Sequence, residues 1–366
     1  IEIKEELLYR KPVKTGEKNS GKVELNAEQK GAVDKVVNDY RKGINGRYLL
    51  FGITGSGKTE VYMEIMEEVI SRGKQVIFLI PEIALSFQMV ERLSARFGER
   101  ISIMNSRMSQ GERYDQYLRA KNGDIDIIVG PRSALFTPFE HLGLIIVDEE
   151  HEGSYKSSKT PRYHAREVAL YRAEEEGAAI ILGSATPSLE AVKLASDKEI
   201  EVLMLLSRPA GAIPPEIEVA DLREELKEGN KSIISRRLSE LIKDRLTKGE
   251  QTILFINRRG YAGFISCRSC GEAIKCPHCD VSLTFHRPDR LVCHYCGYEE
   301  KMPDKCPKCN SPYIGTFGLG TEKVEEIVKK DFPTARVLRM DGDTTTGKNG
   351  HEAILERFKK GEADIL

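Results

Sequence analysis

The sequence predicts an α/β protein with parallel sheets in two lobes and a small cysteine-rich module inserted in the second lobe. Short apolar strands alternate with helical segments, and strands such as LGLIIV and AAIIL are apolar on both faces, which is typical of parallel sheets covered by helices. All 8 cysteines lie between Cys267 and Cys309. A length of 366 residues also favours two domains over a single core.

Composition and charge narrow the class of protein. The hydrophobic fraction of 40% and the charged fraction of 31% are typical of soluble globular proteins. No apolar run is long enough to span a membrane, and no basic-then-apolar leader opens the chain, so we expect a cytoplasmic protein without a membrane partner. The net charge is −1, so any nucleic-acid site has to be a local patch.

The first lobe is predicted to follow a short linker. Residues 1–24 are rich in Lys and Glu and lack a clear period, whereas strands and helices alternate over residues 25–206. RYLLFG reads as a strand, and KTEVYMEIMEEVISRG as a helix that Gly73 ends. The later strands of this lobe are predicted at QVIFLI, DIIVG, LIIVD and AIILG.

The second lobe follows a segment rich in Pro and Gly, SRPAGAIPPEIEV, which is a candidate hinge. We assign residues 207–262 and 313–366 to this lobe, with the cysteine-rich insertion at residues 263–312 between its two parts. A helix near residues 234–248 is followed by predicted strands at QTILFIN, RVLRM and ADIL.

The segment GITGSGKT satisfies the phosphate-binding pattern G-x-x-x-x-G-K-[ST], and it lies between a predicted strand and a predicted helix, as that motif requires. Its glycines let backbone N–H groups turn toward phosphate oxygens, and the helix N-terminus adds a favourable dipole. Lys58 is predicted to reach the β- and γ-phosphates. The candidate ATP-binding residues of this loop are Gly52, Ile53, Thr54, Gly55, Ser56, Gly57, Lys58 and Thr59.

A buried apolar strand runs directly into the acidic segment DEEH, residues 148–151. Like charges this close repel and are costly to bury, so they need compensation. In P-loop enzymes an Asp at a neighbouring strand end holds Mg²⁺, which predicts Asp148 and Thr59 as its ligands. Glu149 is predicted to activate the attacking water, and His151 to link the nucleotide to other motifs. The alternative is a solvent-facing acidic strand end without a partner.

The cysteines form four CxxC knuckles with the pattern CxxC-x5-CxxC-x13-CxxC-x9-CxxC. Two knuckles supply four thiolates for one tetrahedral Zn²⁺, so eight make two sites. Three pairings of knuckles are possible, and the spacing favours a nested one. The outer site then contains Cys267, Cys270, Cys306 and Cys309, and the inner site contains Cys276, Cys279, Cys293 and Cys296. Disulfides and iron–sulfur clusters are the alternatives, and His278, His286 and His294 are interpreted as bystanders.

Several motifs together resemble those of superfamily 2 DNA and RNA helicases. GITGSGKT, DEEH and GSATPS occur in the order found there, and LIPEIALSFQ and VGPRSALFTPF are similar to the superfamily's DNA-contacting motifs. NRRGYA, followed by the cysteine-rich insertion, resembles the PriA family of primosomal replication-restart helicases. The resemblance covers nearly all of residues 25–366 and places Gln29 where these helicases read adenine.

This resemblance implies two RecA-like P-loop lobes and an ATP-dependent DNA helicase with 3′–5′ polarity. It further implies Mg²⁺ and two Zn²⁺ as cofactors, and single-stranded and forked DNA as partners. Single-stranded DNA-binding protein and primosome or helicase-loading proteins are the protein partners that it implies, in the bacterial cytoplasm at the nucleoid. The favoured zinc pairing also agrees with it.

The ends of the sequence suggest a fragment. The chain starts at Ile1 rather than Met, and it stops at GEADIL, before the position of the family's arginine finger. Arginine fingers contribute orders of magnitude to phosphoryl transfer. We therefore expect this isolated chain to bind ATP, to hydrolyse it poorly and not to unwind DNA.

The segment SYKSSKTPRYHAR, residues 154–166, mixes aromatic and basic side chains. Aromatic rings stack on bases and cations follow phosphates, but a solvated loop whose tyrosines pack on the lobe fits the composition equally well. The resemblance, to an aromatic-rich loop of the PriA family, favours DNA contact, although Pro161 replaces a larger aromatic residue and the chain has no Trp. The candidate DNA contacts are Arg132, Tyr155, Lys156, Arg162, Tyr163 and Arg259.

Two other functions remain open from the sequence. The protein is alternatively a zinc-bearing scaffold that recruits replication proteins and uses ATP only as a switch, or a P-loop kinase with a zinc insertion. The zinc module itself is alternatively a structural staple that folds through metal binding. GLGTEKVEE, residues 318–326, either seats a DNA phosphate at a helix N-terminus or is a plain loop.

Overall fold

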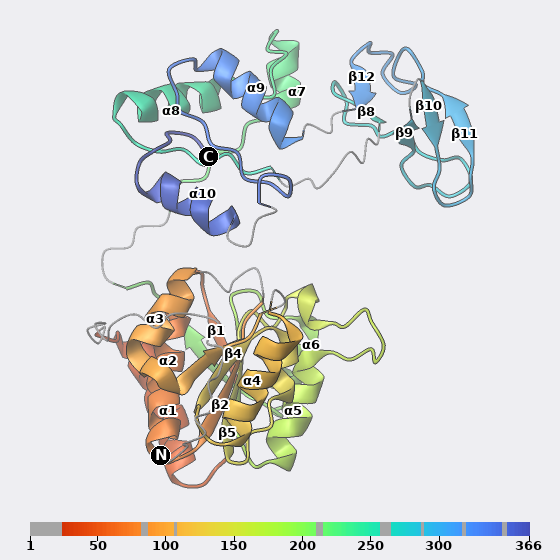
Figure 1. Cartoon of the computed structure of the whole chain (residues 1–366). Helices are drawn as coiled ribbons and strands as arrows, with labels where there is room; N and C mark the ends of the chain where they lie inside the picture. Colours follow the sequence, from red (N-terminus) through yellow and green to blue (C-terminus); the bar gives the residue numbers. More distant parts are fainter. Residues whose placement is uncertain are drawn as a thin grey trace, which may run out of the picture. The chain divides into compact units, whose positions relative to one another are not determined.

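The computed structural model describes residues 24–81, 87–105, 108–209, 215–256, 265–286, 289–316, 320–345 and 350–366. The chain divides into one unit up to Pro214 and a second from Pro215, a few residues later than the boundary expected at 206/207. Figure 1 shows the elements of each unit. Within the described residues, no helix is both long enough and apolar enough to cross a bilayer.

The first unit is built on a seven-stranded sheet with the order β3-β4-β2-β5-β6-β1-β7. Every neighbouring pair of strands is parallel, which confirms the predicted sheet type. The strands are β1 Arg47–Gly52, β2 Gln75–Leu79, β3 Ile101–Ile103, β4 Ile127–Gly130, β5 Leu142–Val147, β6 Ala179–Ser184 and β7 Glu201–Leu205.

Helices cover both faces of this sheet (Figure 1). Successive strand residues point to opposite faces, so Val76 and Phe78 of β2 join one core while Ile77 and Leu79 join the other. The first core includes α1 Ala27–Arg41, α2 Lys58–Ser71 and α3 Phe87–Phe97. The second includes α4 Gln110–Lys121, α5 Ala165–Glu175, α6 Leu189–Ser196 and the 3₁₀ turn η2 Arg132–Phe136. Two further 3₁₀ turns are η1 Gly98–Arg100 and η3 Gly153–Tyr155.

The strand order brings three functional segments to one edge of the sheet. β6 lies between β5 and β1, with Val147 beside Leu182 and Phe51 beside Ser184. Because parallel strands end at a common edge, the loop after β1, the DEEH segment after β5 and the GSATPS segment at the end of β6 all emerge together.

The second unit contains α7 Leu222–Lys227, α8 Arg236–Thr247, α9 Thr321–Asp331 and α10 Gly350–Lys359. The predicted strands QTILFIN, RVLRM and ADIL differ from expectation, since in the described residues they form isolated parallel bridges rather than continuous strands. Ile365 is the central residue and bridges both Thr252 and Val337.

The cysteine-rich module of this unit consists of two small antiparallel sheets. β8 Ile265–Cys267 pairs with β12 Ile314–Thr316, so the two ends of the module lie side by side. The other sheet has the order β11-β10-β9 and contains β9 Thr284–His286, β10 Arg290–Val292 and β11 Glu299–Lys301. The core of the module is small, with Ile265, Ile274, Leu283 and Leu291 as its buried aliphatic residues.

Candidate functional site

The loop between β1 and α2 has the backbone of a phosphate cradle. Gly55 and Gly57 both have φ of 80°, a left-handed conformation that favours glycine. Gly57 is the N-cap of α2 and provides no side-chain cap, whereas Asn26 and Ser109 cap α1 and α4 with their side chains. The first N–H groups of α2 are therefore available to an anion.

Gln29 supports this loop from α1. Its side chain is 3% exposed, its Nε2 donates to the Ser56 carbonyl at 2.8 Å, and its Oε1 accepts from the Asn26 N–H at 2.8 Å. A Cβ at position 57 would lie 2.3 Å from Gln29 Nε2, so the glycine is required by this close approach. Adenine reading by Gln29 stays a prediction.

Lys58 joins the cradle to the acidic strand end. Its Nζ donates to the Gly52 carbonyl at 3.1 Å and lies 3.6 Å from Glu149 Oε1. The side chain is only 10% exposed. The DEEH segment therefore has a cation beside it, which comes from a residue ninety positions earlier in the chain and was not apparent from the local sequence.

Asp148 is buried at the end of β5 and is held on both sides. Tyr62 of α2 donates its hydroxyl to Asp148 Oδ1 at 2.9 Å, and Tyr155 donates to the Asp148 carbonyl at 2.7 Å. Burial, reinforced by the charge of Glu149, raises the pKa of Asp148 to about 6. Sequence reasoning missed Tyr62, which lies one helical turn after Lys58 and reads as a core residue.

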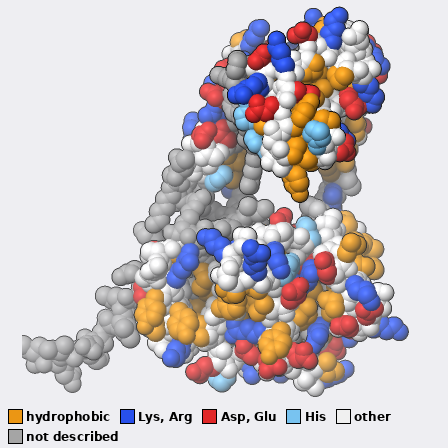
Figure 2. All heavy atoms as spheres, turned by 90° about the vertical axis from the view of Figure 1, so that its right-hand side faces the viewer, with side chains coloured by type: hydrophobic (Ala, Val, Ile, Leu, Met, Phe, Trp, Pro, Cys, Tyr) orange, Lys and Arg blue, Asp and Glu red, His pale blue; other side chains and the backbone are white. Residues whose placement is uncertain are grey.

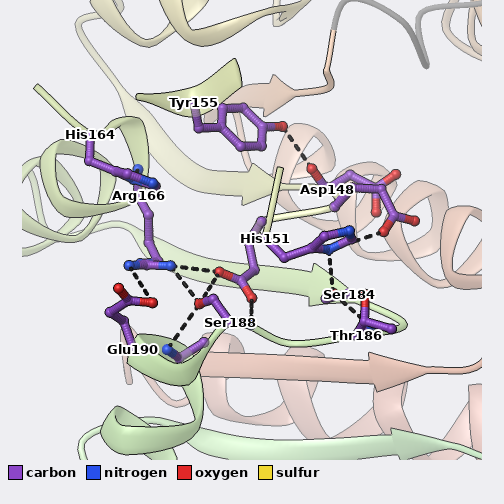
Figure 3. A network of polar contacts seen from close by, with 12 residues as sticks. Asp148, His151, Tyr155, His164, Arg166, Ser184, Thr186, Ser188 and Glu190 are labelled. Carbon is purple, nitrogen blue, oxygen red and sulfur yellow. Dashed lines mark hydrogen bonds and ion pairs between the residues drawn. The ribbon is translucent and has the colours of Figure 1, made fainter. Parts of the chain in front are cut away.

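Glu149 presents its carboxylate at the edge of the sheet. The residue has φ of 46°, a left-handed conformation that is uncommon and costly for residues other than glycine. Its side chain is 32% exposed and its Oε2 lies 3.6 Å from His151 Nδ1. His151 Nδ1 in turn lies 2.8 Å from Ser184 Oγ, which accepts from the Thr186 N–H, so the imidazole connects DEEH with GSATPS (Figure 3).

The donor set fits a hard divalent cation. The Asp148 carboxylate and the Thr59 hydroxyl are oxygen ligands, the type that Mg²⁺ prefers, and they emerge from neighbouring segments of one sheet edge. Burial, with the added charge of Glu149, raises the pKa of Asp148, and a cation bound at this carboxylate would offset both effects.

Glu150, the third residue of DEEH, has a different role from its neighbours. It is 0% exposed and pairs with Arg166 at the start of α5, with 2.9 Å between Oε2 and Nη1. Ser188 of GSATPS donates to the same carboxylate through its backbone and its hydroxyl. No local pattern in the sequence predicts this pairing, because Arg166 lies within SYKSSKTPRYHAR, whose mixture of aromatic and basic residues suggests DNA contact.

The eight cysteines form two clusters in the second unit. One contains Cys267, Cys270, Cys306 and Cys309, and the other contains Cys276, Cys279, Cys293 and Cys296. Within each cluster all ligand atoms lie within 4.8 Å of one another. This is the nested pairing, and four sulfur donors at this separation suit tetrahedral Zn²⁺.

The four knuckles share one backbone pattern. In each, the N–H of the residue after the second cysteine donates to the carbonyl of the first cysteine. These following residues are Gly271, Asp280, Gly297 and Asn310, and each has a positive φ between 54° and 78°. Gly, Asn and Asp are the residues that best tolerate this conformation, so the sequence carries the signal for each turn.

Local hydrogen bonds favour the thiolate form of individual cysteines within the clusters. Burial opposes ionisation of Cys267, but the N–H groups of Cys270 and Ser269 outweigh it and lower the pKa of the thiol. The same balance lowers the pKa of Cys293. His286 and His294 contact each other, with 3.1 Å between their Nε2 atoms, and neither belongs to a cysteine cluster.

The candidate DNA contacts of the 154–166 segment differ in how far their side chains are exposed to solvent. Lys156 and Arg162 are exposed, and Tyr163 is half-buried with its ring edge-on to that of Phe136 at 5.3 Å between centroids. The Tyr155 ring, by contrast, is 1% exposed and packs in the core, so in this structure it is not available to stack on a base. Phe136, which lies within the motif VGPRSALFTPF, is 56% exposed.

Arg132 donates to the carbonyls of Ser154 and Lys156 and thereby holds the segment in place, and its contact with DNA stays a prediction. Arg259 and the rest of NRRGYA lie outside the described residues, as do residues 82–86 of LIPEIALSFQ. In the other lobe, α9 begins after Gly320, which supplies no side-chain cap.

Two family models match the chain. Residues 22–189 match "Type III restriction enzyme, res subunit", and residues 276–301 match "PriA DNA helicase Cys-rich region (CRR) domain". The Replication restart protein PriA of Bacillus subtilis (strain 168) is 48% identical over 343 residues, 93% of this chain and 43% of the relative. This chain belongs to the PriA family. The PriA of Synechocystis sp. is 47% identical over 87% of this chain and 40% of its own length.

The chain thus spans less than half the length of these two PriA relatives. Similarity to solved structures is lower. "Structure of RecG bound to three-way DNA junction" matches with a TM-score of 0.49 at 17% identity, covering 94% of this chain and 36% of that chain.

Proposed function

We propose that this chain is the ATP-binding and ATP-hydrolysing region of a replication-restart DNA helicase and that the whole protein moves along single-stranded DNA. The observation that carries the proposal is the meeting of three chemically distinct groups at one sheet edge: an uncapped helix N-terminus, a buried lysine and a carboxylate 3.6 Å from it. Membership of the PriA family supports the proposal.

In this proposal, the residues at this edge of the sheet have separate roles in phosphoryl transfer. The backbone of residues 52–57 and the Lys58 ammonium bind the β- and γ-phosphates, and Gln29 lies beside the loop where it reads adenine. Thr59 and Asp148 hold Mg²⁺, which when bound offsets charge on the phosphates. Glu149 accepts a proton from the attacking water. The Lys58 ammonium, 3.6 Å from Glu149 Oε1, holds the Glu149 carboxylate toward this position.

The DNA strand is proposed to contact the segment after DEEH. The exposed Phe136 ring and the half-buried Tyr163 ring form an edge-on pair on which a base can stack, and Lys156 and Arg162 supply charge for the phosphates. Figure 2 shows basic and hydrophobic side chains next to one another on a face of the first unit. Arg259 in NRRGYA is a further proposed contact from the second lobe.

The zinc module is proposed to assist unwinding and to contact partners. Its match to the PriA cysteine-rich region supports this assignment. We propose that the whole protein acts at forks with 3′–5′ polarity, together with single-stranded DNA-binding protein and helicase-loading proteins, in the bacterial cytoplasm at the nucleoid.

The Lys58→Ala variant of the whole protein tests the ATP site. Removing the ammonium is expected to lower DNA-stimulated ATP hydrolysis by at least about a hundredfold, because charge on the phosphates is no longer compensated. Lys121→Ala, which removes an exposed lysine of α4, serves as the control and is expected to keep full activity. Turnover that survives in Lys58→Ala would refute the phosphate site.

A strand-displacement assay on forked DNA tests the motor. The proposal expects unwinding that depends on ATP hydrolysis. If the protein binds forks and recruits replication proteins without displacing a strand, the scaffold alternative replaces the motor.

A further inference from the structure

The cysteine-rich module contains a pair of histidines that the two cysteine clusters do not use. His286 is the last residue of β9, and His294 follows Cys293 within the third knuckle. Both residues are exposed, and their Nε2 atoms lie 3.1 Å apart. The ring centroids are 5.1 Å apart, so the rings meet through the edges that carry Nε2 rather than through their faces. Two nitrogen atoms of a type that binds metals are thus held next to each other at the surface.

The separation of the two nitrogens can be compared with that of the sulfur atoms in the cysteine clusters. Tetrahedral Zn²⁺ places sulfur ligands about 3.8 Å apart and nitrogen ligands about 3.4 Å apart, given bond lengths of about 2.3 Å and about 2.1 Å. Sulfur pairs lie at 3.5 Å and 3.7 Å in the outer cluster and at 3.5 Å in the inner cluster. The imidazole nitrogens at 3.1 Å are shorter than the metal-bound value by a similar margin.

The backbone fixes the positions from which the two rings meet. His286 lies in register opposite Arg290 of β10, and His294 lies between two cysteines of the inner cluster, Cys293 and Cys296. A hydrogen bond from one Nε2 to the other would account for the contact, but between exposed side chains it contributes little, because water competes for both partners. Two fixed donors gain more from a shared ion, since neither has to be ordered when the ion binds.

The charged residues of this small sheet do not oppose a bound cation. Arg290 lies opposite His286, and Lys301 lies opposite Arg290 in β11, so these three side chains share a face. Arg290 pairs with Glu299 at 3.0 Å, and Lys301 lies 3.7 Å from Asp289. Each positive charge is therefore offset by a carboxylate, and solvent screens the remaining repulsion.

We propose that His286 and His294 form a third metal site of the module, which binds one divalent transition-metal ion such as Zn²⁺ or Ni²⁺ through the two Nε2 atoms. Imidazole nitrogen suits these ions, whereas Mg²⁺ and Ca²⁺ prefer oxygen ligands. The ion takes the place of the hydrogen between the rings, which moves to Nδ1 of the ring that carried it.

This third site differs in kind from the two cysteine clusters. Four thiolates close the coordination sphere of a zinc ion, whereas two imidazoles leave further positions to water. The ion at the histidine pair therefore exchanges readily and is removed by dialysis against metal-free buffer. Its removal leaves the module folded, because the cysteine clusters keep their zinc.

Equilibrium dialysis of the zinc-loaded protein against Ni²⁺ tests the site. Metal analysis counts nickel and zinc separately, so loss of zinc from the cysteines would be visible. We expect nickel to bind at the histidine pair while the zinc content stays at two per chain. His286→Gln and His294→Gln are each expected to weaken this binding at least about tenfold, because the remaining imidazole loses a second donor that acts at high effective concentration.

His278→Gln is the matched control. His278 is an exposed histidine of the same module, and its ring packs edge-on to that of Tyr298 at 5.3 Å between centroids. This variant is expected to bind nickel as the unaltered protein does. The double variant of His286 and His294 is expected to lose no more than either single variant, since both rings hold the same ion.

A second measurement needs no variant. Paramagnetic Ni²⁺ is added in small steps to the unaltered zinc-loaded protein, and the imidazole NMR signals are followed. The signals of His286 and His294 are expected to broaden first and together, and an excess of Zn²⁺ is expected to restore them where Mg²⁺ does not.

The contrary outcomes are equally specific. Nickel binding of equal strength in the unaltered protein and in both single variants would overturn the site, as would broadening that begins at other histidines. Additive losses in the double variant would assign the rings to separate ions and would overturn the shared site. Displacement of nickel by Mg²⁺ would show oxygen ligands and would also overturn it.

Discussion

The sheet of the first unit and the cysteine-rich module are stabilised in opposite ways. The sheet buries two large apolar clusters, one on each face, with most strand side chains fully excluded from water. The module buries few aliphatic side chains and instead gathers eight sulfur atoms in two clusters. In the first region, the large buried apolar surface offsets the cost of burying charges at the functional edge. The module has too small a core for this, so we expect its fold to depend on bound zinc.

Removal of zinc gives the largest expected difference between the two regions. Structural zinc sites contribute on the order of 10 kcal/mol each in apparent binding free energy, so a strong chelator is expected to unfold the module. Metal analysis should find two zinc ions per chain, and limited proteolysis after chelation should cut within residues 265–316 while the first unit resists. Equal proteolysis of both regions, or an intact module without metal, would contradict the comparison.

Packing in the sheet is tested by Gly183→Ala. A Cβ at this position would lie 1.7 Å from the Tyr62 hydroxyl, so the variant is expected to lose about 1–3 kcal/mol of unfolding free energy. Urea denaturation measures the loss. Adding Tyr62→Phe is expected to restore part of it, because the hydroxyl is removed.

The matching glycine of the module is Gly315 in β12, where a Cβ meets nothing within 4 Å. Gly315→Ala is therefore expected to be close to neutral. A larger loss at Gly315 than at Gly183 would show that close packing is not what separates the two regions.

The pH dependence of the unfolding free energy tests how much the charge of Asp148 destabilises the folded chain. Its pKa is about 6 in the folded chain against a usual value of 3.8, so the folded state binds more protons between these values and loses stability as the pH rises through them. Without magnesium and nucleotide, Asp148→Asn should gain about 2 kcal/mol relative to the unaltered chain between about pH 4 and pH 7.

Urea denaturation of both proteins at each pH gives this difference, and the zinc sites affect both proteins equally. A difference that stays constant with pH would mean that Asp148 titrates at its ordinary pKa.

The smallest expected effect concerns the turns of the knuckles. Gly271→Ala and Gly297→Ala place a side chain at positive φ in otherwise open space, at a cost of about 1 kcal/mol, or about fivefold in zinc affinity. Asn310→Gly makes the opposite change in an equivalent turn and is expected to bind zinc at least as tightly. Chelator competition measures all three, and an unchanged affinity in both alanine variants would exclude conformational strain as the reason for glycine.

Much of this arrangement could be predicted from the sequence because it depends on local patterns. Apolar runs of strand length predicted the parallel sheet, and the knuckle spacing favoured the pairing that the structure brings together. The phosphate loop and DEEH were expected at neighbouring strand ends, whereas in the sheet β6 lies between β1 and β5.

The remaining features depend on contacts between distant residues. Tyr62 reads as a core position of α2, yet its hydroxyl reaches Asp148, eighty-six residues away. Arg166 reads as a surface cation, yet it is buried against Glu150. Tyr155 reads as an exposed aromatic residue, yet the turn at Gly153–Tyr155 directs it into the core. The spacing of apolar residues along the chain does not distinguish these three side chains from ordinary core or surface residues.

The pairing of β8 with β12 has a consequence for how such a chain can change over time. The module begins and ends with two adjacent paired strands, in which Ile314 lies opposite Cys267. Insertions, deletions or replacements inside the module can therefore leave the distance between its two ends unchanged. The sequence of the module can therefore change during evolution without a matching change in the lobe that carries it.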